Sequence, residues 1–376
     1  MDNLYKKVLI VGAGLAGSTI ARILAENSIK VFVIEKRNHV AGNIYDYENE
    51  NNERIHKYGP HLLHCSRNSE ALKFLSRFTD WVKYEHRVRA LLPNGSTTPL
   101  PINKTTIENF FSKKFKNEFE VREFLNLKRN KNLTPNNTDE LFEYSVGNEM
   151  ADIFFRPYTR KMWGIDPKQL EISIGARLPV RTNEDDRYFN DNFQALPKNG
   201  YTKMIQNMLD HDNIHLKLNT DYEKGMEVDY LHAFLCTPID KYYDYKYGVL
   251  PYRSIIFNDK KETTEDFSAP VINFTDDSSF TRKTQWNLLP NSYGKINKVK
   301  TVTYEMPCSL EENPGEYYYP VQTKDSRFIY QKYQELSKKQ KKITFCGRTG
   351  LFKYIDMIPA VGIHIKIANK FLNQSL

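Results

Sequence analysis

The sequence has few cysteines, and their spacing fits neither a metal site nor a disulfide framework. The 376 residues contain four cysteines, Cys65, Cys236, Cys308 and Cys346, which are far apart and form no C-x-x-C pair. Structural metal sites and disulfide-stapled secreted domains depend on closely spaced cysteines. We therefore predict no metal site and a reducing, cytoplasmic setting.

Long hydrophobic runs are also missing. No apolar stretch approaches the ~20 residues of a membrane span, and the N-terminus leads into a predicted strand rather than a signal peptide. Hydrophobic residues make up 40% and charged residues 27%, which is typical of a soluble globular protein. The length predicts more than one domain.

The net charge of +8 invites a nucleic-acid interpretation, but the lysines are scattered. The one dense run, 338–342, precedes a predicted strand and is typical of a solvated face. No recognised nucleic-acid module accompanies it. We expect no nucleic-acid partner, and substrates with phosphate groups suit the positive field better.

The first 35 residues carry the most specific motif. An apolar run at 7–11 is read as a buried strand, the turn Gly12-x-Gly14-x-x-Gly17 opens a helix over 15–27, and a second strand at 31–34 ends at Glu35. In a dinucleotide-binding unit the glycines allow a tight turn and close approach of a pyrophosphate, and the acid accepts hydrogen bonds from a ribose. The pattern predicts a bound dinucleotide.

The remaining patterns predict an α/β protein with a Rossmann-like dinucleotide-binding domain, an inserted helical domain and a mostly antiparallel β-sheet domain. Further helices are expected over 68–78, 201–209 and 360–372. Strands are expected at 214–218, 233–238 and 343–348, a hairpin at 88–100, and antiparallel strands at 252–257, 271–274 and 298–305. Predominantly helical spacing runs from 105 to 169, with a polar break at 130–139.

A strand, turn and helix at both ends of the chain imply that the C-terminus completes the nucleotide domain. That arrangement is typical of flavin proteins, and the sequence has no second G-x-G-x-x-G for a separate nicotinamide domain. We predict a discontinuous FAD-binding domain over 1–76, 200–247 and 320–376. The helical domain is expected over 104–176, and the antiparallel substrate domain over 77–103, 177–199 and 248–319.

Several stretches together resemble one family, the bacterial UDP-galactopyranose mutases. They follow in order from Val8 to Met357, over nearly the whole chain. The matching segments are 34–43, 56–64, Y-T-R-K-M-W-G at 158–164, R-L-P-V-R at 177–181 with Tyr188-Phe189, V-I-N-F-T-D at 271–276, Y-Y-P-V at 318–321 and K-Y-x-D-M at 353–357.

The resemblance implies a non-redox isomerase that converts UDP-galactopyranose to UDP-galactofuranose. In this family reduced FAD is the nucleophile, and its N5 displaces the nucleotide to give a covalent flavin–sugar adduct. The ring then opens, recloses through another hydroxyl, and the nucleotide reattaches. The resemblance also implies a homodimer that serves cell-surface polysaccharide biosynthesis.

The matched positions suggest roles for particular residues. Arg181 and Arg282 would hold the leaving diphosphate, because a planar guanidinium binds phosphate oxygens in pairs, and Arg177 would support Arg181. His61 would act beside the flavin. The cofactor-binding positions are Gly12, Gly14, Leu15, Gly17, Glu35, Lys36, Asn43, His61, Leu62, Arg253, Arg348, Tyr354, Asp356 and Met357. The substrate-binding positions are Phe154, Tyr158, Thr159, Trp163, Arg181, Tyr188, Arg282, Tyr318, Tyr354 and His64.

Purely structural roles for these residues, and other functions for the protein, remain open. Arginines can form surface salt bridges, and the aromatic residues at 154, 158 and 163 can be core. The sequence also departs from the family pattern at Pro60, Leu62, Leu63, Cys65, Pro157 and Phe193, and a tyrosine is more usual at position 193. The same chemistry on dTDP-fucopyranose or UDP-N-acetylgalactosamine therefore stays possible, as do a redox flavin oxidase and a catalytically silent nucleotide-sugar binder.

Overall fold

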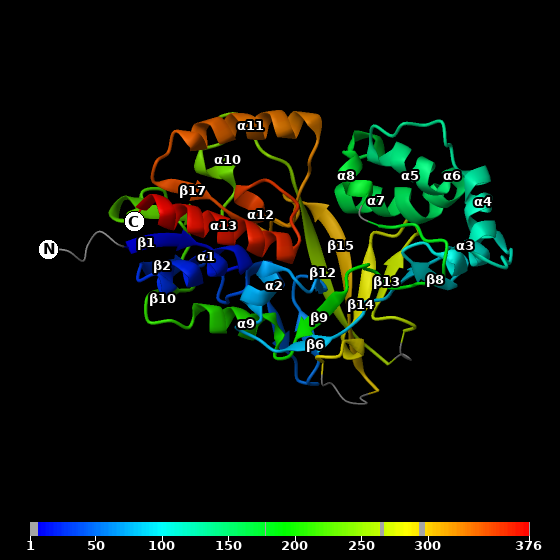
Figure 1. The fold of residues 1–376 in the computed structure, drawn as a ribbon, viewed down its shortest axis with the longest axis horizontal. Helices are drawn as coiled ribbons and strands as arrows, with labels where there is room; N and C mark the ends of the chain where they lie inside the picture. Colours follow the sequence, from blue (N-terminus) through cyan, green and yellow to red (C-terminus); the bar gives the residue numbers. More distant parts are fainter. Residues whose placement is uncertain (1–6, 177, 264–266, 293–297, 376) are drawn as a thin grey trace.

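The computed structural model describes residues 7–176, 178–263, 267–292 and 298–375. Figure 1 shows three parts: a parallel sheet covered by helices, a long antiparallel sheet beside it, and a helical unit at the opposite end of the molecule. This confirms the expected fold class.

The parallel sheet has five strands in the order β10-β2-β1-β11-β17, and every neighbouring pair is parallel. Its strands come from three distant segments of the chain. They are β1 (Lys7–Val11), β2 (Lys30–Ile34), β10 (Ile214–Lys217), β11 (His232–Leu235) and β17 (Ile343–Phe345). The C-terminal segment therefore returns to complete the sheet, as predicted. The exact domain limits given above stay a prediction.

Both faces of this sheet are buried, which explains its continuous apolar strands. Because side chains alternate along a strand, Val8 and Ile10 point to one core cluster while Leu9 and Val11 point to another. The first cluster lies under α1 (Leu15–Glu26), α2 (Glu70–Leu75), α9 (Gly200–Leu209) and α13 (Met357–Ser375). The second lies under α10 (Ile239–Tyr242) and α11 (Lys324–Lys338).

The second sheet has seven strands in the order β16-β12-β15-β14-β13-β7-β8. Their bounds are β16 (Tyr319–Pro320), β12 (Tyr252–Glu262), β15 (Lys300–Ser309), β14 (Arg282–Gln285), β13 (Val271–Phe274), β7 (Val88–Leu91) and β8 (Thr97–Leu100). The β7–β8 hairpin is confirmed. The expectation that β13 is antiparallel holds toward β14 but is wrong toward β7, which it joins in parallel. A long excursion rather than a hairpin separates these two strands, so no turn dictates their relative direction.

The helical unit begins after β8. It contains α3 (Lys104–Phe111), α4 (Glu118–Lys128), α5 (Thr138–Val146), α6 (Asn148–Met150), η2 (Ala151–Phe155), α7 (Arg156–Trp163), η3 (Pro167–Gln169) and α8 (Ile172–Gly175). Asn103, Asn117 and Asn137 each cap a helix by accepting a backbone N–H of its first turn. The polar break predicted at 130–139 is the connection between α4 and α5.

Two small sheets were not predicted, because four of their five strands are only three residues long and cannot show a period. They are β3 (Asp46–Glu48) with β4 (Arg54–His56), and β5 (Leu63–Cys65), β9 (Phe193–Pro197) and β6 (Trp81–Lys83). The short elements η1 (Gly42–Ile44), η4 (Met226–Asp229), η5 (Trp286–Leu288) and α12 (Gly347–Gly350) complete the fold. The strand expected over 343–348 therefore ends at Phe345.

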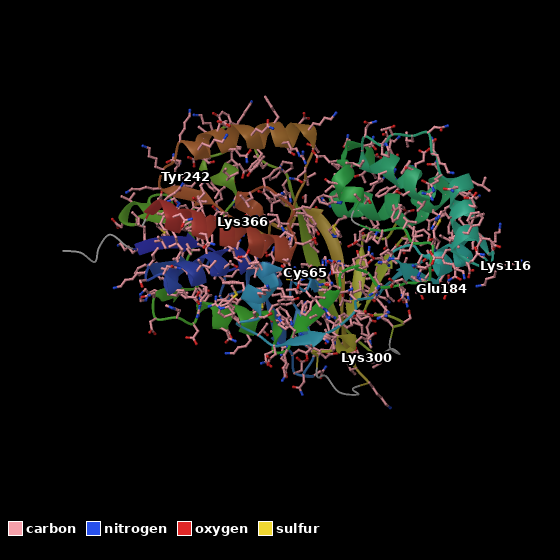
Figure 2. All side chains as sticks on the ribbon, viewed as in Figure 1. Cys65, Lys116, Glu184, Tyr242, Lys300 and Lys366 are labelled. Atoms are coloured by element: carbon pink, nitrogen blue, oxygen red, sulfur yellow. The ribbon has the colours of Figure 1, made fainter. Side chains whose placement is uncertain are left out.

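The basic side chains are spread over the molecule rather than gathered in one patch. Lys116, Lys300 and Lys366 lie on three separate parts of it (Figure 2). The lysines at 338, 339, 341 and 342 are exposed at the end of α11 and in the loop after it, as expected of a solvated face. Among the described residues, no helix combines the length and apolar character needed to cross a membrane.

Candidate active site

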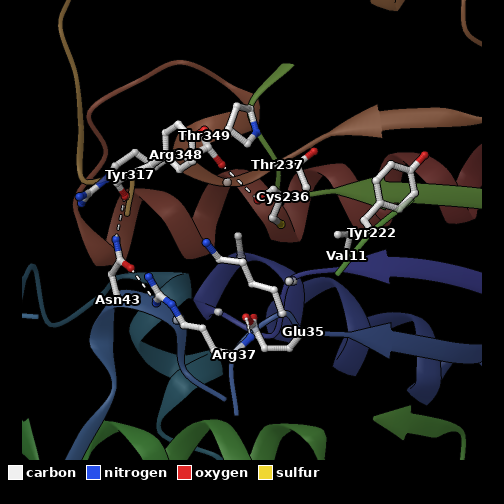
Figure 3. A pocket seen from close by; sticks show the side chains of 18 of the residues that line it. Val11, Glu35, Arg37, Asn43, Tyr222, Cys236, Thr237, Tyr317, Arg348 and Thr349 are labelled. Carbon is white, nitrogen blue, oxygen red and sulfur yellow. Dashed lines mark hydrogen bonds between the residues drawn. The ribbon is translucent and has the colours of Figure 1, made fainter. Parts of the chain in front are cut away.

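A cavity of about 550 Å³ opens at the carboxyl ends of the parallel strands. Val11 ends β1, while Glu35 and Cys236 directly follow β2 and β11. Figure 3 shows Glu35, Arg37 and Asn43 on one side of this space and Tyr317, Arg348 and Thr349 on the other. Open α/β sheets bind ligands at this edge, and the volume falls in the range of ordinary cofactor sites.

The glycine turn forms one wall of the cavity and brings helix α1 against the strand. Gly12 has φ +104°, a conformation that side chains rarely adopt. A Cβ on Gly17 would lie 2.0 Å from the carbonyl oxygen of Gly12, so the space permits no side chain there. No side chain caps the first turn of α1, and its N–H groups are therefore available to a phosphate.

Glu35 is buried at the end of β2, where the fingerprint placed it. Its Oε2 accepts the N–H of Ala13 (2.9 Å) and its Oε1 accepts the N–H of Arg37 (2.9 Å). Two backbone donors thus fix the carboxylate at the rim of the cavity. The remaining lone pairs of the same oxygens can accept from ribose hydroxyls.

The segment 315–317 crosses the cavity from the antiparallel sheet to the loop after β2. Lys36 Nζ donates to the carbonyl of Gly315 (2.7 Å), and Asn43 Nδ2 donates to that of Tyr317 (3.2 Å). Arg37 pairs with Glu316 at 2.5 Å. Lys36 and Asn43, both predicted cofactor ligands, therefore also join two distant segments around the cavity.

Most of the predicted cofactor residues come together here. The cavity is lined by Gly12, Gly14, Leu15, Gly17, Glu35, Lys36, Asn43, His61, Arg348 and Met357. The predicted residues outside its lining are Leu62, Arg253, Tyr354 and Asp356. Cavity residues that the motifs did not indicate include Tyr222, Cys236, Thr237, Tyr317 and Thr349.

Arg253 has a clear alternative role. Its guanidinium donates to the carbonyls of Met162 (3.2 Å) and Lys161 (3.3 Å) at the C-terminal end of α7. A cation at a helix C-terminus satisfies carbonyls that lack a partner within the helix. These contacts favour a structural role, and the predicted interaction with a flavin stays a prediction.

Arg348 links the cavity to an aromatic cluster beside it. Its guanidinium donates to the carbonyls of Tyr318 and Ile355 (both 3.0 Å) and lies 5.0 Å from the ring centre of Tyr354. The rings of Trp163, Tyr319 and Tyr354 pack together, with centres 5.1–6.2 Å apart. Trp163 and Tyr354, two of the predicted site residues, thus lie in one aromatic cluster.

Tyr319, rather than the predicted Tyr318, belongs to this cluster. The ring of Tyr318 packs instead against Tyr58 and Phe257. Neighbouring side chains of an extended segment point to opposite faces, so a shift of one residue decides which tyrosine reaches the site. The motif Y-Y-P-V could not separate the two.

Arg282 lies in the same region. Its Nε is 2.7 Å from Oε2 of Glu305, and the electrostatic neighbours of this arginine include Tyr158, Tyr319 and His61. Burial alone would lower the pKa of Arg282, but Glu305 raises it well above its usual value, so the guanidinium stays charged. Burial also raises the pKa of Tyr158, which keeps that phenol neutral.

Arg181, the other predicted diphosphate ligand, is held by its own loop. Its Nη1 donates to the carbonyls of Asp185 (3.1 Å) and Arg187 (2.5 Å), and its Nη2 donates to Oδ1 of Asn190 (2.5 Å). Because both terminal nitrogens are engaged, the structure favours an anchoring role for this residue. Arg177 lies outside the described residues.

The other predicted substrate residues divide between core and loop. Phe154 is buried against Phe110 in the helical unit, and Thr159 is also buried. Tyr188 is an electrostatic neighbour of Tyr158. His64 stacks on Phe189 at 3.7 Å and lies 2.7 Å from Asp191. Phe193, the departure from the family pattern, packs edge-on against Trp81.

His61 is neutral in this arrangement. Burial lowers its pKa to about 3. Its Nδ1 lies 2.8 Å from the carbonyl of Gly59 and must donate to it, which leaves Nε2 as an acceptor. His61 lines the cavity and neighbours Arg282, so it lies between the cavity and the region around Arg282.

Two buried histidines predict a loss of stability in mild acid. Burial lowers the pKa of His56 and His86 to about 3 each, against about 6.5 in an unfolded chain. The unfolded state therefore binds protons that the folded state cannot, and stability is lost as the pH falls from 6.5 toward 3. Each histidine should remove about 2 kcal/mol by pH 5.

Urea unfolding at pH 7 and pH 5 measures this effect. The variant His86→Asn should show a smaller difference between the two pH values than the natural sequence. An unchanged difference would contradict the assignment of His86 as a buried neutral group.

Two family models match this chain, and together they cover most of the features described above. A family model described as UDP-galactopyranose mutase matches residues 153–354. A second model, described as an NAD(P)-binding Rossmann-like domain, matches residues 10–78. The two matches cover the glycine turn and most of the residues around Arg282.

Curated relatives match over the full length. A protein named "Probable UDP-galactopyranose mutase" from Klebsiella pneumoniae is 35% identical over 377 residues, covering 100% of this chain and 96% of the relative. A dTDP-fucopyranose mutase from Escherichia coli is 33% identical and covers 98% and 99%.

Solved structures agree on the fold. A reduced UDP-galactopyranose mutase superposes with a TM-score of 0.76 at 18% identity, covering 99% of this chain and 95% of that one. A putrescine oxidase variant reaches 0.57 at 15% identity, covering 98% and 99%. At such identities the likeness shows a shared fold alone.

Proposed function

Because the chain belongs to the UDP-galactopyranose mutase family, we propose that it interconverts the six- and five-membered ring forms of a nucleotide-bound sugar. The proposed substrate is UDP-galactopyranose and the product UDP-galactofuranose. One observation carries the proposal: a charged, partly buried arginine and several neutral tyrosines adjoin a dinucleotide-sized cavity, with His61 at the junction.

We propose FAD as the cofactor of the cavity, with the reduced form active. The residues present fit such a group, since an uncapped helix N-terminus can receive the pyrophosphate and Glu35 a ribose. The position of Gly42 supports this fit, because a Cβ there would lie 3.0 Å from the Cα of Gly14 and fill the space between the two loops. When bound, a reduced flavin would supply an electron-rich nitrogen as the nucleophile for the anomeric carbon of the sugar.

The chain itself supplies position and charge. Arg282 holds the diphosphate, whose negative charge grows as it leaves the sugar. Tyr158 and Tyr319 donate hydrogen bonds to phosphate or sugar oxygens without adding charge, because burial keeps both phenols neutral; it raises the pKa of Tyr319 to about 12. Trp163 and Tyr354 form an apolar wall that excludes water from the reacting carbon.

The dTDP-fucopyranose mutase relative supports a second candidate substrate. At 33% identity over nearly the full length, it matches almost as well as the protein from Klebsiella pneumoniae. Both candidates share the diphosphate and differ at the base, at the 2′ position of the pentose and at the sugar C6 position. The residues around Arg282 serve either of them equally, so substrate choice depends on the rest of the pocket.

A product assay over a panel of nucleotide sugars tests the proposal. The flavin-loaded protein, reduced with dithionite, is incubated separately with UDP-galactopyranose, dTDP-fucopyranose and UDP-N-acetylgalactosamine. We expect a furanose product from UDP-galactopyranose at the highest kcat/KM. Formation of furanose from dTDP-fucopyranose alone would move the assignment to the second candidate, and no furanose from any of the three would refute both.

A further inference from the structure

Arg282 and Glu305 face each other across two neighbouring strands. They are directly paired in the antiparallel register of β14 and β15, with Arg282 Nε 2.7 Å from Glu305 Oε2. The Glu305 side chain is fully buried, at 0% exposure, whereas that of Arg282 keeps 21%. The carboxylate is therefore enclosed, and the guanidinium reaches from it toward a more open region.

The contact at Nε decides how the guanidinium is presented. Among the described residues, neither Arg282 Nε nor either Glu305 oxygen has a well-aligned hydrogen-bond partner, so the contact is an ion pair. A carboxylate beside Nε still attracts the planar group from its side and leaves the terminal nitrogens for another anion. Arg181 shows the opposite arrangement, since both N–H groups of its Nη1 and one N–H group of its Nη2 are donated to loop oxygens. Of these two arginines, Arg282 is the one arranged to bind an external phosphate.

The turn that carries His61 supports the pair from a second side. Gly59 has φ +86°, and a Cβ there would lie 3.1 Å from Glu305 Oε1 and 3.5 Å from Arg282 Nη2. The Gly59 carbonyl in turn receives the Nδ1–H of His61. The backbone of this turn therefore rests on the ion pair and limits the movement of both side chains.

Burying this pair has an energetic consequence. Burial raises the pKa of the Glu305 carboxyl, and Arg282 opposes the rise. Buried ion pairs contribute little net stability, because the loss of hydration offsets the attraction. A gain in stability is therefore a weak explanation for a buried carboxylate at Glu305. A constraint on the geometry of Arg282 explains the buried carboxylate better.

We propose that Glu305 is a positioning residue that fixes the guanidinium plane of Arg282 and so presents its terminal nitrogens to the diphosphate of the nucleotide sugar. The inference rests on the proposed function and extends it, since it explains how one arginine is aimed. It concerns binding of the nucleotide diphosphate, so UDP itself is a sufficient probe.

A double-mutant cycle tests the proposal on the full-length, flavin-loaded protein. The variants are Glu305→Met, which keeps the side-chain length but removes the acceptor, Arg282→Leu, and the two combined. Isothermal titration with UDP gives the Kd, and thermal melting reports on folding. Glu53→Gln is the matched control, because Glu53 is also buried and contacts the same strand through Thr301, away from Arg282.

We expect Glu305→Met to weaken UDP binding about 10- to 100-fold, in line with the loss of a charge-assisted contact. In the Arg282→Leu background the same change should add nothing, because Glu305 acts only through Arg282. Glu305→Gln keeps an oxygen that can accept from Nε and should bind UDP at least as tightly as the natural protein. Glu53→Gln should lower the melting temperature without changing the Kd.

Two results would overturn the proposal: an unchanged Kd in Glu305→Met, or an equal loss in both backgrounds. If Glu305→Met does not fold, Glu305→Asp decides. This variant keeps the charge but withdraws the carboxylate by one methylene. A positioning role predicts weaker UDP binding, whereas a role in charge balance alone predicts an unchanged Kd for UDP. Failure of the natural protein to bind UDP would instead refute the proposed function.

Discussion

Arg282→Leu is expected to lower kcat/KM for ring contraction about 1,000-fold, because the leaving diphosphate loses its charged partner at the transition state. Removing one preorganised donor from such a site typically costs a factor of this size. The substitution also leaves Glu305 buried without its cation, which destabilises the fold. Activity must therefore be measured together with the melting temperature and the flavin absorption spectrum.

Lys283→Leu is the matched control for this prediction. Lys283 is the next residue of β14, and its Nζ lies over the ring of Phe267 at 4.3 Å, on the opposite face of the sheet. Loss of this charge should leave kcat/KM nearly unchanged. The combined change Arg282→Leu with Glu305→Met removes the buried charge and should recover stability without recovering activity. Recovery of activity in the double variant would show that Arg282 is structural.

Gly17→Ala is expected to destabilise the parallel-sheet domain by about 3 kcal/mol or more and to yield protein without bound flavin. Helix propensity alone would favour alanine by about 1 kcal/mol. However, the new Cβ would stand 2.0 Å from the carbonyl oxygen of Gly12, and neither backbone segment can withdraw without moving α1 from the sheet. Flavin content after purification and the melting temperature measure the effect.

Gly362→Ala provides the comparison, because it makes the same change in another helix. Gly362 lies in α13, and a Cβ there would meet nothing within 4 Å. Its melting temperature should stay the same or rise. If Gly17→Ala behaved like Gly362→Ala and kept its flavin, close packing of α1 on the glycine turn would not be a requirement of this fold.

The parallel sheet was readable from the sequence because its strands carry local signals. Val8 to Val11 and Val31 to Ile34 are continuous apolar runs, and the glycine turn fixes their connection. The segment that forms β17, Ile343–Phe345, also lies in such a run. The short strands β3 to β6 were missed, since three residues cannot show a period. The parallel pairing of β13 with β7 depends on tertiary packing, which no local pattern encodes.

The site was only partly readable, for a related reason. Residues in motifs, such as Trp163 and Arg348, could be proposed because the motif itself singles them out, and both lie in or beside the cavity. Glu305 was missed because a glutamate within a long strand reads as an exposed residue, and only the register with Arg282 reveals it as buried. Alternation along the chain decides between Tyr318 and Tyr319, and loop folding decides the role of Arg181.

Several earlier expectations stay predictions. They are the homodimer, the cytoplasmic location, the exact domain limits and the roles of all candidate site residues toward cofactor and substrate. The oxidase alternative shares the fold, as the likeness to putrescine oxidase shows. It differs in one measurable respect, because an oxidase acts with oxidised flavin and consumes oxygen, whereas ring contraction transfers no net electrons.

The central claim is a non-redox ring contraction that needs the reduced cofactor, and one measurement tests it most directly. UDP-galactopyranose is incubated without oxygen with the oxidised and the dithionite-reduced protein, and furanose formation is followed by chromatography. The account predicts that the reduced protein forms furanose over many turnovers and that its flavin is still reduced at the end. The oxidised protein should form almost no furanose. Equal activity in both states, or reoxidation of one flavin for each product molecule, would contradict it.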